Sequence, residues 1–454
     1  MKNFIWTHQS IKTIEVNDDP IQSITNKARQ VVYEAIQQGW SGPPFDPFKL
    51  ADILKINIIP SEDILDAHII ATKGGKLVIE FNPNRSRARI RYSIAHELAH
   101  TLFPDCAQKV RNRLKKDDIK PSDWQMEMLC NIGAAELLMP IGSFPDLAKK
   151  HMNIDYLMDL RKQYEVSAEA LLLRAVKLTN ECCAVFCSSK RETGNRKENY
   201  QIDYMISSRT NDRALEIGSK LPSKSVVEEC TMVGFTAKGN EDWPSNFGKV
   251  HIECVALPPY PAHRYPRVAG FVSLKRGEKI STNKIEYLKG DATEPRGKEN
   301  KIIAFIINDK GHSWGAGFAR AVQKKWPFVL EEFQHWITHD RSEFTLGNIN
   351  SSKIEDDLTV VEMVSQHGYG DSVTPRIRYG ALDVCLRKLA KIALRQNASV
   401  HMPRIGSGQA GGSWWIVSEL IEEILLKAGV KVTVYDLPNV NKSHTKQQLS
   451  FAEW

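Results

Sequence analysis

The sequence lacks any apolar run near the roughly 18 residues that a membrane-spanning helix needs, so we expect no integral membrane protein. Its first residues, 1–10, hold one lysine and no apolar core of a secretory leader, which predicts a cytoplasmic location. None of the 8 cysteines forms a Cys-x-x-Cys pair, so zinc-finger spacing is excluded. In a cytoplasmic chain these cysteines are expected to be reduced thiols in the core.

Neither positive nor negative charge predominates in the sequence. The 61 Lys and Arg exceed the 54 Asp and Glu by only 7 over 454 residues. This surplus does not indicate a nucleic-acid partner. Hydrophobic residues make up 42% and charged residues 25%, as in ordinary globular proteins. At roughly 150 residues per domain, the length predicts about three domains.

Hydrophobic periodicity divides the chain into three parts and a tail. The first part combines helices with two short strands, and its expected elements are helices at 21–38, 50–54, 89–103, 124–138, 152–164 and 168–178 and strands at 56–59 and 76–81. The middle part is β-rich, with strands expected at 183–187, 200–206, 225–235, 250–256 and 267–274. From residue 285 strands alternate with helices, which is typical of an α/β layered sheet: strands at 285–289, 302–307, 358–364, 399–402 and 430–435, helices at 316–325, 379–395 and 413–427.

The first candidate site is the sequence His-Glu-Leu-Ala-His at residues 96–100. On a helix, His96 and His100 project from one face, close enough to share a metal ion. A catalytic zinc has three protein ligands and one open position for water. Glu97 is placed to act as the general base on that water. Two imidazoles and a carboxylate also accept manganese or iron, so spacing alone leaves the metal open.

The third ligand has to come from another segment. The helix at 124–138 offers Glu127 and Glu136, and we favour Glu127. Four residues later, Asn131 lies on the same helical face and can brace a ligating imidazole. We interpret Glu136 as a charge on the helix surface.

With these residues in place, the run 89–103 and the segment 127–140 resemble the ImmA/IrrE family of bacterial metallopeptidases over about residues 20–180. The resemblance implies zinc held by His96, His100 and Glu127, with Glu97 as the catalytic residue. Members of that family cleave helix-turn-helix or similar regulators, which implies a protein substrate. The β-rich middle resembles the GAF-like extension that some members carry.

The second candidate site consists of three loops that follow strands near the C-terminus. These are Lys289–Thr293, Trp314–Ala319 and Gly406–Gly412. Glycines let the backbone approach a pyrophosphate, and a helix start adds N–H donors for the same anion. In an open α/β sheet, ligands bind beyond the carboxyl ends of the strands.

These loops resemble a macrodomain over about residues 283–438, and most closely the branch that removes terminal ADP-ribose from proteins. The resemblance implies that Asp291 contacts the adenine and that Asn308 faces the distal ribose. It further implies that two loops enclose the diphosphate, formed by Gly315, Ala316, Gly317 and Phe318 and by Gly406, Ser407, Gly408, Gln409 and Ala410.

The sequence departs from that branch where its hydrolases carry a catalytic aspartate and lysine. Ala410 occupies the position of the aspartate, and no lysine occurs between Lys353 and Lys388. Lysine–aspartate chemistry is therefore not expected, although binding can survive. His367 is the nearby titratable residue for a different mechanism, and a loop histidine is usually only solvated.

The fold class expected is thus multidomain: an α+β zincin-like domain at 1–180, a β-rich GAF-like region at 181–282, an α/β three-layer macrodomain at 283–438 and a polar tail at 439–454. The main hypothesis is a zinc-dependent endopeptidase for a regulatory protein, coupled to ADP-ribose or an ADP-ribosylated protein. One alternative is an ADP-ribosyl hydrolase or an ADP-ribose-1″-phosphate phosphatase with a regulatory metal domain. The other is a non-enzymatic ADP-ribose reader.

Overall fold

The chain folds into two compact units in the computed structural model. The first comprises residues 1–28, 43–139 and 144–282, and the second residues 29–42, 140–143 and 283–454. The structure describes residues 8–14, 20–72, 76–106, 123–144, 151–190, 199–208, 211, 215–243, 247–259, 264–273, 284–311, 314–370, 372 and 374–437. The polar tail expected at 439–454 lies outside the described residues.

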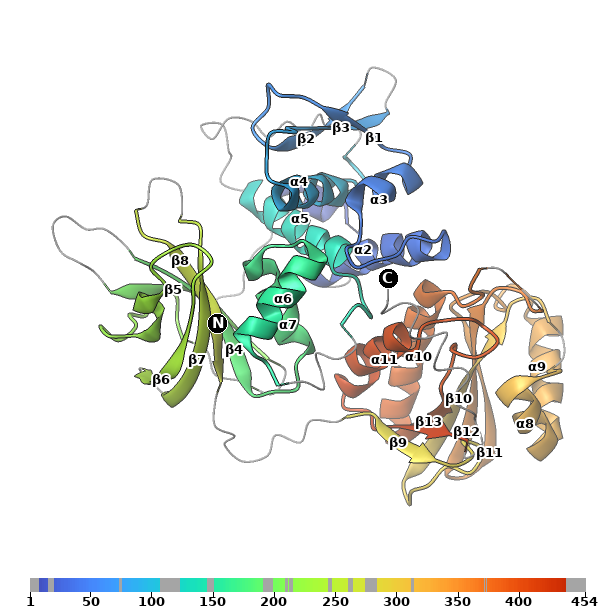
Figure 1. The fold of residues 1–454 in the computed structure, drawn as a ribbon. Helices are drawn as coiled ribbons and strands as arrows, with labels where there is room; N and C mark the ends of the chain where they lie inside the picture. Colours follow the sequence, from blue (N-terminus) through green and yellow to red (C-terminus); the bar gives the residue numbers. More distant parts are fainter. Residues whose placement is uncertain are drawn as a thin grey trace. The chain divides into compact units, whose positions relative to one another are not determined.

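Helices and a small sheet make up the N-terminal elements (Figure 1), which are in order α1 (Gln9–Lys12), α2 (Pro20–Gln37), α3 (Pro47–Ile53), β1 (Asn57–Pro60), β2 (Ala67–Ala71), β3 (Leu77–Phe81), α4 (Arg87–His100) and α5 (Asp123–Leu138). Strand β3 is central, parallel to β1 and antiparallel to β2. The helices and strands expected here are present with boundaries shifted by a few residues, whereas β2 was not predicted.

Helices α4 and α5 pack closely because small residues meet where they cross. A Cβ atom on Gly133 would lie 3.0 Å from Cβ of Ala99, so only a glycine fits without a shift. Ile94, Leu98 and Leu129 on the same two helices are also buried. This close approach places the polar side chains of α5 beside those of α4.

The rest of the first unit combines two helices with an antiparallel sheet: α6 (Ile154–Tyr164), α7 (Ala168–Leu178), β4 (Cys183–Lys190), β5 (Tyr200–Ser207), η2 (Val226–Glu229), β6 (Thr236–Trp243), β7 (Gly248–Leu257) and β8 (Arg267–Ser273). The sheet order is β5-β4-β8-β7-β6. An antiparallel sheet alone does not define a GAF-like fold, so that finer assignment stays a prediction. Cys183 and Cys187 are buried in β4, as expected for core thiols.

The prediction of a strand at residues 225–235 in this sheet is wrong. Residues 225–235 form the 3₁₀ helix η2 and a loop instead. The Ser225 side chain accepts a hydrogen bond from the Val227 N–H, which starts the helical turn. Gly234 then has φ +89°, a left-handed conformation that ends the loop before β6 begins at Thr236.

The second unit contains a six-stranded sheet with helices on both faces. Its elements are β9 (Glu286–Lys289), β10 (Asn300–Asn308), α8 (Gly317–Lys325), α9 (Pro327–His339), β11 (Ile349–Glu355), β12 (Leu358–Gln366), α10 (Tyr379–Gln396), β13 (Ala398–Pro403), α11 (Trp414–Ile421), the π-helical η3 (Glu422–Leu426) and β14 (Val432–Asp436). The strand order is β11-β12-β10-β13-β14-β9, and only the pairing of β11 is antiparallel.

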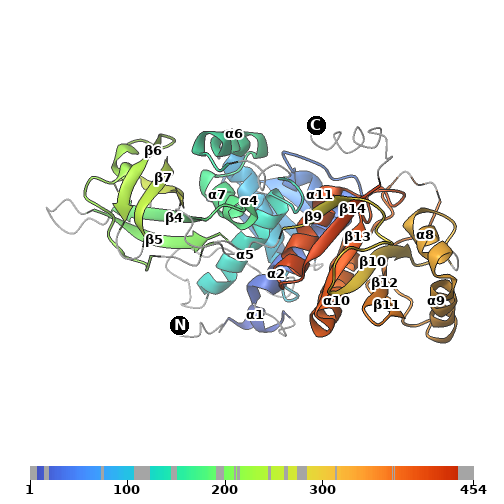
Figure 2. The same ribbon diagram turned by 90° about the horizontal axis from the view of Figure 1, so that it is seen from below.

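Two hydrophobic cores, one on each face of this sheet, make the second unit a three-layer α/β structure. Helices α10 and α11 cover one face and α8 and α9 the other (Figure 2). Because the strands other than β11 run parallel, their carboxyl ends meet at a single edge. This edge carries all three glycine-rich loops.

No helix among the described residues combines the length and apolar character needed to cross a bilayer.

Candidate functional site

The two motif histidines lie on the C-terminal half of α4 and face the same neighbour. His96 and His100 are 1% and 3% exposed, and their ring centroids are 5.0 Å apart. Burial of two imidazoles in one place is costly unless polar groups meet them. Such a pair is therefore expected to have a partner supplied by another element.

Helix α5 supplies that partner through Glu127. One carboxylate oxygen, Oε2, lies 3.0 Å from Nε2 of His96, and the other, Oε1, lies 3.7 Å from Nε2 of His100. Two imidazole nitrogens and a carboxylate are a donor set that zinc takes in catalytic sites. The three residues expected to be ligands therefore converge, with matching atoms turned toward one another.

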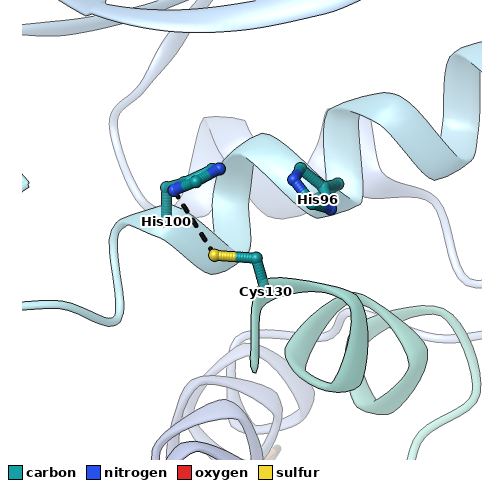
Figure 3. A group of neighbouring side chains, drawn as sticks. All are labelled: His96, His100 and Cys130. Carbon is teal, nitrogen blue, oxygen red and sulfur yellow. Dashed lines mark hydrogen bonds between the residues drawn. The ribbon is translucent and has the colours of Figure 1, made fainter. Parts of the chain in front are cut away.

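Cys130 also contacts this group, and sequence reasoning did not single it out. His96, His100 and Cys130 offer ligand atoms that all lie within 4.8 Å of one another (Figure 3). The thiol Sγ lies 3.3 Å from Nδ1 of His100. The available signal was its place three residues after Glu127, on the same helical face.

Either Glu127 or Cys130 could complete a ligand set with His96 and His100, and the ring nitrogens that each contacts differ. Glu127 meets Nε2 of both histidines, whereas Cys130 meets Nδ1 of His100. A single ion bound to both Nε2 atoms would match Glu127, with Cys130 behind the His100 ring, and this choice of ligand stays a prediction. A ligating histidine commonly uses its second nitrogen in this way, to hold the ring in place.

Asn131 contacts Nδ1 of His96, just as Cys130 contacts Nδ1 of His100. Its Oδ1 lies 2.8 Å from Nδ1 of His96 and accepts a hydrogen bond of 2.6 Å from the Tyr92 hydroxyl. Because an amide oxygen accepts hydrogen bonds, Nδ1 is the nitrogen placed to donate to it. A metal ion would then be held through Nε2, the nitrogen that faces Glu127.

Glu97 projects toward the small sheet. Its carboxylate is 1% exposed, and its Oε2 accepts a hydrogen bond of 3.0 Å from the backbone N–H of Ile69 on β2. This bond fixes the carboxylate between helix α4 and the edge strand β2. The prediction that Glu97 is a general base remains a proposal.

Glu136 is not the surface charge that the sequence suggested. It is 4% exposed, and its Oε1 accepts a hydrogen bond of 3.3 Å from Nη1 of Arg174 on α7. The Arg174 side chain reaches this face of α5 from α7, and pairing compensates the burial of both charges. Glu136 is thus a structural ion-pair residue.

The second candidate site lies at the carboxyl edge of the six-stranded sheet. Asp291, just beyond β9, is exposed, and its Oδ1 accepts a hydrogen bond of 2.8 Å from the Thr293 N–H. Asn308 ends β10, and its Oδ1 accepts hydrogen bonds from the N–H groups of Lys310 and Gly311. The side-chain oxygen of Asn308 therefore holds the turn that follows β10.

The two glycine loops lie side by side at this edge. Gly315, Ala316, Gly317 and Phe318 lead into α8, whose first residue, Gly317, has φ +65°. The other loop contains Gly406, Ser407, Gly408, Gln409 and Ala410. A Cβ atom on Gly317 would lie 3.8 Å from Oε1 of Gln409, which joins the two loops in space.

The loop from Gly406 is held in its conformation by its neighbours. Gly406 has φ +76°, and a Cβ atom there would lie 2.3 Å from Cδ1 of Ile377. The carbonyl of Ala410 accepts hydrogen bonds from the N–H groups of Arg376, at 2.8 Å, and Ile377. Gly315 and Gly408, in contrast, have open space where a Cβ would be.

Comparisons with known proteins match both regions. A family model described as an IrrE N-terminal-like domain, of the peptidase M78 family, matches residues 52–176. The chromodomain-helicase-DNA-binding protein 1-like of Mus musculus is 29% identical over 181 residues, which span 37% of this chain and 19% of that protein. The present chain thus corresponds to about a fifth of that relative's length.

Two solved structures are also similar. A protein of unknown function from Bacteroides thetaiotaomicron is 45% identical, covering 34% of this chain and 98% of that chain with a TM-score of 0.33. A macrodomain protein from Streptomyces coelicolor is 39% identical, covering 34% of this chain and 99% of that chain with a TM-score of 0.30. Residues 52–176 thus match the IrrE N-terminal-like model of the peptidase M78 family, and macrodomains are among the solved structures similar to this chain.

Proposed function

We propose that this chain is a zinc-dependent endopeptidase that acts on a regulatory protein and binds ADP-ribose through its C-terminal region. The observation that carries the peptidase part is the Glu127 carboxylate, whose two oxygens meet Nε2 of His96 and of His100. The match to a peptidase M78 model over the same residues supports it.

Each residue of the site has one task in this proposal. Zinc, when bound, supplies Lewis-acid polarisation of the scissile carbonyl and lowers the pKa of a water molecule. Glu97 would accept a proton from the attacking water and pass it to the leaving amine. The hydrogen bond from the Ile69 N–H to one Glu97 oxygen orients the carboxylate.

The test replaces Glu97 by glutamine, which keeps the shape and removes the base. We expect cleavage of a fluorescence-quenched peptide library to fall by about 100-fold or more, as is usual when a general base is lost. The matched control is Glu62→Gln, an exposed glutamate of the same unit, which should leave the rate unchanged. Cleavage by Glu97→Gln at the wild-type rate contradicts the proposal.

The ADP-ribose part rests on the carboxyl edge of the sheet. There, the exposed carboxylate of Asp291 is proposed to accept a hydrogen bond from the adenine amino group. The two loops joined through Gly317 and Gln409 are proposed to enclose the diphosphate with backbone N–H groups. The proposal includes both free ADP-ribose and ADP-ribose attached to a protein.

Calorimetric titration with ADP-ribose tests this part. Asp291→Ala should weaken binding by about 10-fold or more, the usual loss for a hydrogen bond to a charged group. Asp356→Ala is the control, because Asp356 is fully exposed in the turn between β11 and β12 and bonds only Lys353 among the described residues. No heat of binding with the wild-type protein contradicts the proposal.

Coupling of the two activities is a separate part of the proposal. ADP-ribose can change the peptidase rate only if it binds the active and inactive arrangements with different free energies. Peptide cleavage measured with and without saturating ADP-ribose tests this. An unchanged rate contradicts coupling and leaves both individual activities in place.

A further inference from the structure

A carboxylate and an imidazole form a pair at the same sheet edge that carries the glycine loops. Strands β10 and β12 are parallel neighbours, and Asn308 pairs with Gln366 in their register. Asp309 and His367 are the next residues along each strand. Both side chains therefore lie where parallel strands present ligand-binding groups.

The pair is held in place from several directions. Nδ1 of His367 lies 2.8 Å from Oδ2 of Asp309, while Oδ1 of Asp309 accepts a hydrogen bond of 2.9 Å from the Gly368 N–H. The backbone adds two further bonds, from Asp309 N–H to the Gln366 carbonyl at 3.0 Å and from His367 N–H to the Arg376 carbonyl at 2.8 Å. The imidazole thus has a fixed orientation.

Exposure of the two side chains differs in a way that suits proton transfer. The Asp309 side chain is 12% exposed, whereas that of His367 is 48% exposed. Burial raises the pKa of Asp309, but the Gly368 N–H and His367 outweigh it and hold that pKa below its usual value, so the carboxylate is ionised. An ionised carboxylate on Nδ1 leaves Nε2, on the far side of the ring, as the nitrogen that accepts a proton.

We propose that His367 is the general base, and Asp309 its positioning residue, in hydrolysis of ADP-ribose linked to a protein carboxylate. This inference rests on the proposed binding of ADP-ribose at the same edge. It supplies a base where Ala410 stands in the place of an aspartate and where no lysine occurs between Lys353 and Lys388.

One base is sufficient for the proposed hydrolysis. Nε2 of His367 takes one proton from water, and the water oxygen forms a bond to C1″ of the distal ribose. The bond from C1″ to the carboxylate oxygen breaks, and its electron pair leaves with the carboxylate. The products are ADP-ribose and a free carboxylate, and His367 returns its proton to solvent.

The leaving group decides the substrate class. A carboxylate departs as a stable anion without receiving a proton, so no general acid is needed. An arginine-linked ADP-ribose would leave as a strongly basic guanidine and would need one. A site with one oriented base is therefore suited to carboxylate-linked ADP-ribose.

Charged groups around His367 come from two segments. Asp309 and Lys310 follow β10, and Arg376 and Arg378 precede α10. Arg376 donates from Nε to the Gly370 carbonyl at 2.9 Å and from Nη1 to the His367 carbonyl at 3.3 Å. Arg378 donates from Nη1 to the Pro375 carbonyl at 3.0 Å. These arginines hold the loop backbone, which leaves Asp309 as the charged side chain bonded to the His367 ring among the described residues.

The test uses the full chain and a synthetic peptide that carries ADP-ribose on a glutamate carboxylate. We expect wild-type protein to release ADP-ribose and His367→Ala to be slower by about 100-fold or more. ADP-ribose affinity should change by less than about threefold, because Nε2 acts on water. His335→Ala, in the exposed part of α9, is the matched control and should match wild type.

The pH profile separates a catalytic role from a structural one. In wild type the rate should fall at acid pH as the imidazole takes up a proton, and this limb should disappear in His367→Ala. Asp309→Asn should lower the rate without abolishing it, because the amide oxygen can still face Nδ1 but carries no charge to stabilise the transition state. A peptide with arginine-linked ADP-ribose should remain intact throughout.

Four outcomes overturn the inference. These are release by His367→Ala at the wild-type rate, loss of both ADP-ribose binding and ADP-ribose release in both variants, a wild-type rate in Asp309→Asn, and binding by wild type with no release. The last outcome leaves the proposed ADP-ribose site in place. If wild type binds no ADP-ribose, the proposed function itself fails.

Discussion

Replacement of Asn131 by alanine tests how the metal site is held together. The substitution removes the amide oxygen that lies 2.8 Å from Nδ1 of His96, and it leaves all three proposed ligands in place. His96 then loses the group that fixes its tautomer and ring orientation. Losses of this kind weaken metal binding by about 10- to 100-fold, which corresponds to about 1.4 to 2.7 kcal/mol.

The assay is competition for zinc between the protein and a chromophoric chelator at constant pH. Tyr92→Phe is the matched control, because it removes only the hydroxyl that shares Oδ1 of Asn131 at 2.6 Å. Its effect should stay below about threefold, the size of an ordinary exposed hydrogen bond. Zinc affinity of Asn131→Ala within twofold of wild type would refute the reasoning.

Three further predictions concern stability. Burial lowers the pKa of His401 from 6.5 to about 4, so the stability it contributes is complete above about pH 6.5 and is lost toward pH 4. Urea unfolding should show a loss of about 2 to 3 kcal/mol over that range, absent in His401→Gln. Burial raises the pKa of Glu362 well above 4.5, so stability falls as pH rises from 4.5 toward that value. Glu362→Gln should match wild type in stability at pH 4 and be more stable than wild type at pH 8, measured by the same unfolding assay. Gly406→Ala should lower stability by about 1 to 3 kcal/mol, because its Cβ would meet Ile377 and its φ is +76°. Thermal melting checks this against Gly408→Ala, where the space is open, and equal melting temperatures would contradict it.

Local patterns could be predicted well from the sequence. The spacing of His96 and His100 requires only a helix, and the apolar residues Ile90, Ile94 and Leu98 recur at helical spacing in α4. Alternation of strands and helices likewise indicated the α/β layers of the second unit. Strand β11 and helix α9 were not predicted. The first reads Ile-Asn-Ser-Ser-Lys-Ile-Glu, a polar edge strand without an apolar pattern, and the second follows α8 after the single residue Trp326.

Contacts between distant residues could be predicted only in part. The choice of Glu127 depended on α5 lying against α4, a contact that Gly133 and Ala99 make possible. Glu136 was misread because the sequence does not reveal that α7 covers it with Arg174. The pairing of Asp309 with His367, 58 residues apart, follows from the register of β10 and β12, which no local pattern contains.

The most direct test of the central claim is zinc content per chain by mass spectrometry of the metal, after dialysis against a weak chelator. The account predicts one zinc ion in wild type and in Glu97→Gln, and far less than one in Glu127→Ala and His100→Ala. Equal zinc in wild type and Glu127→Ala, with loss only in Cys130→Ala, would contradict the assignment of Glu127 as the third ligand.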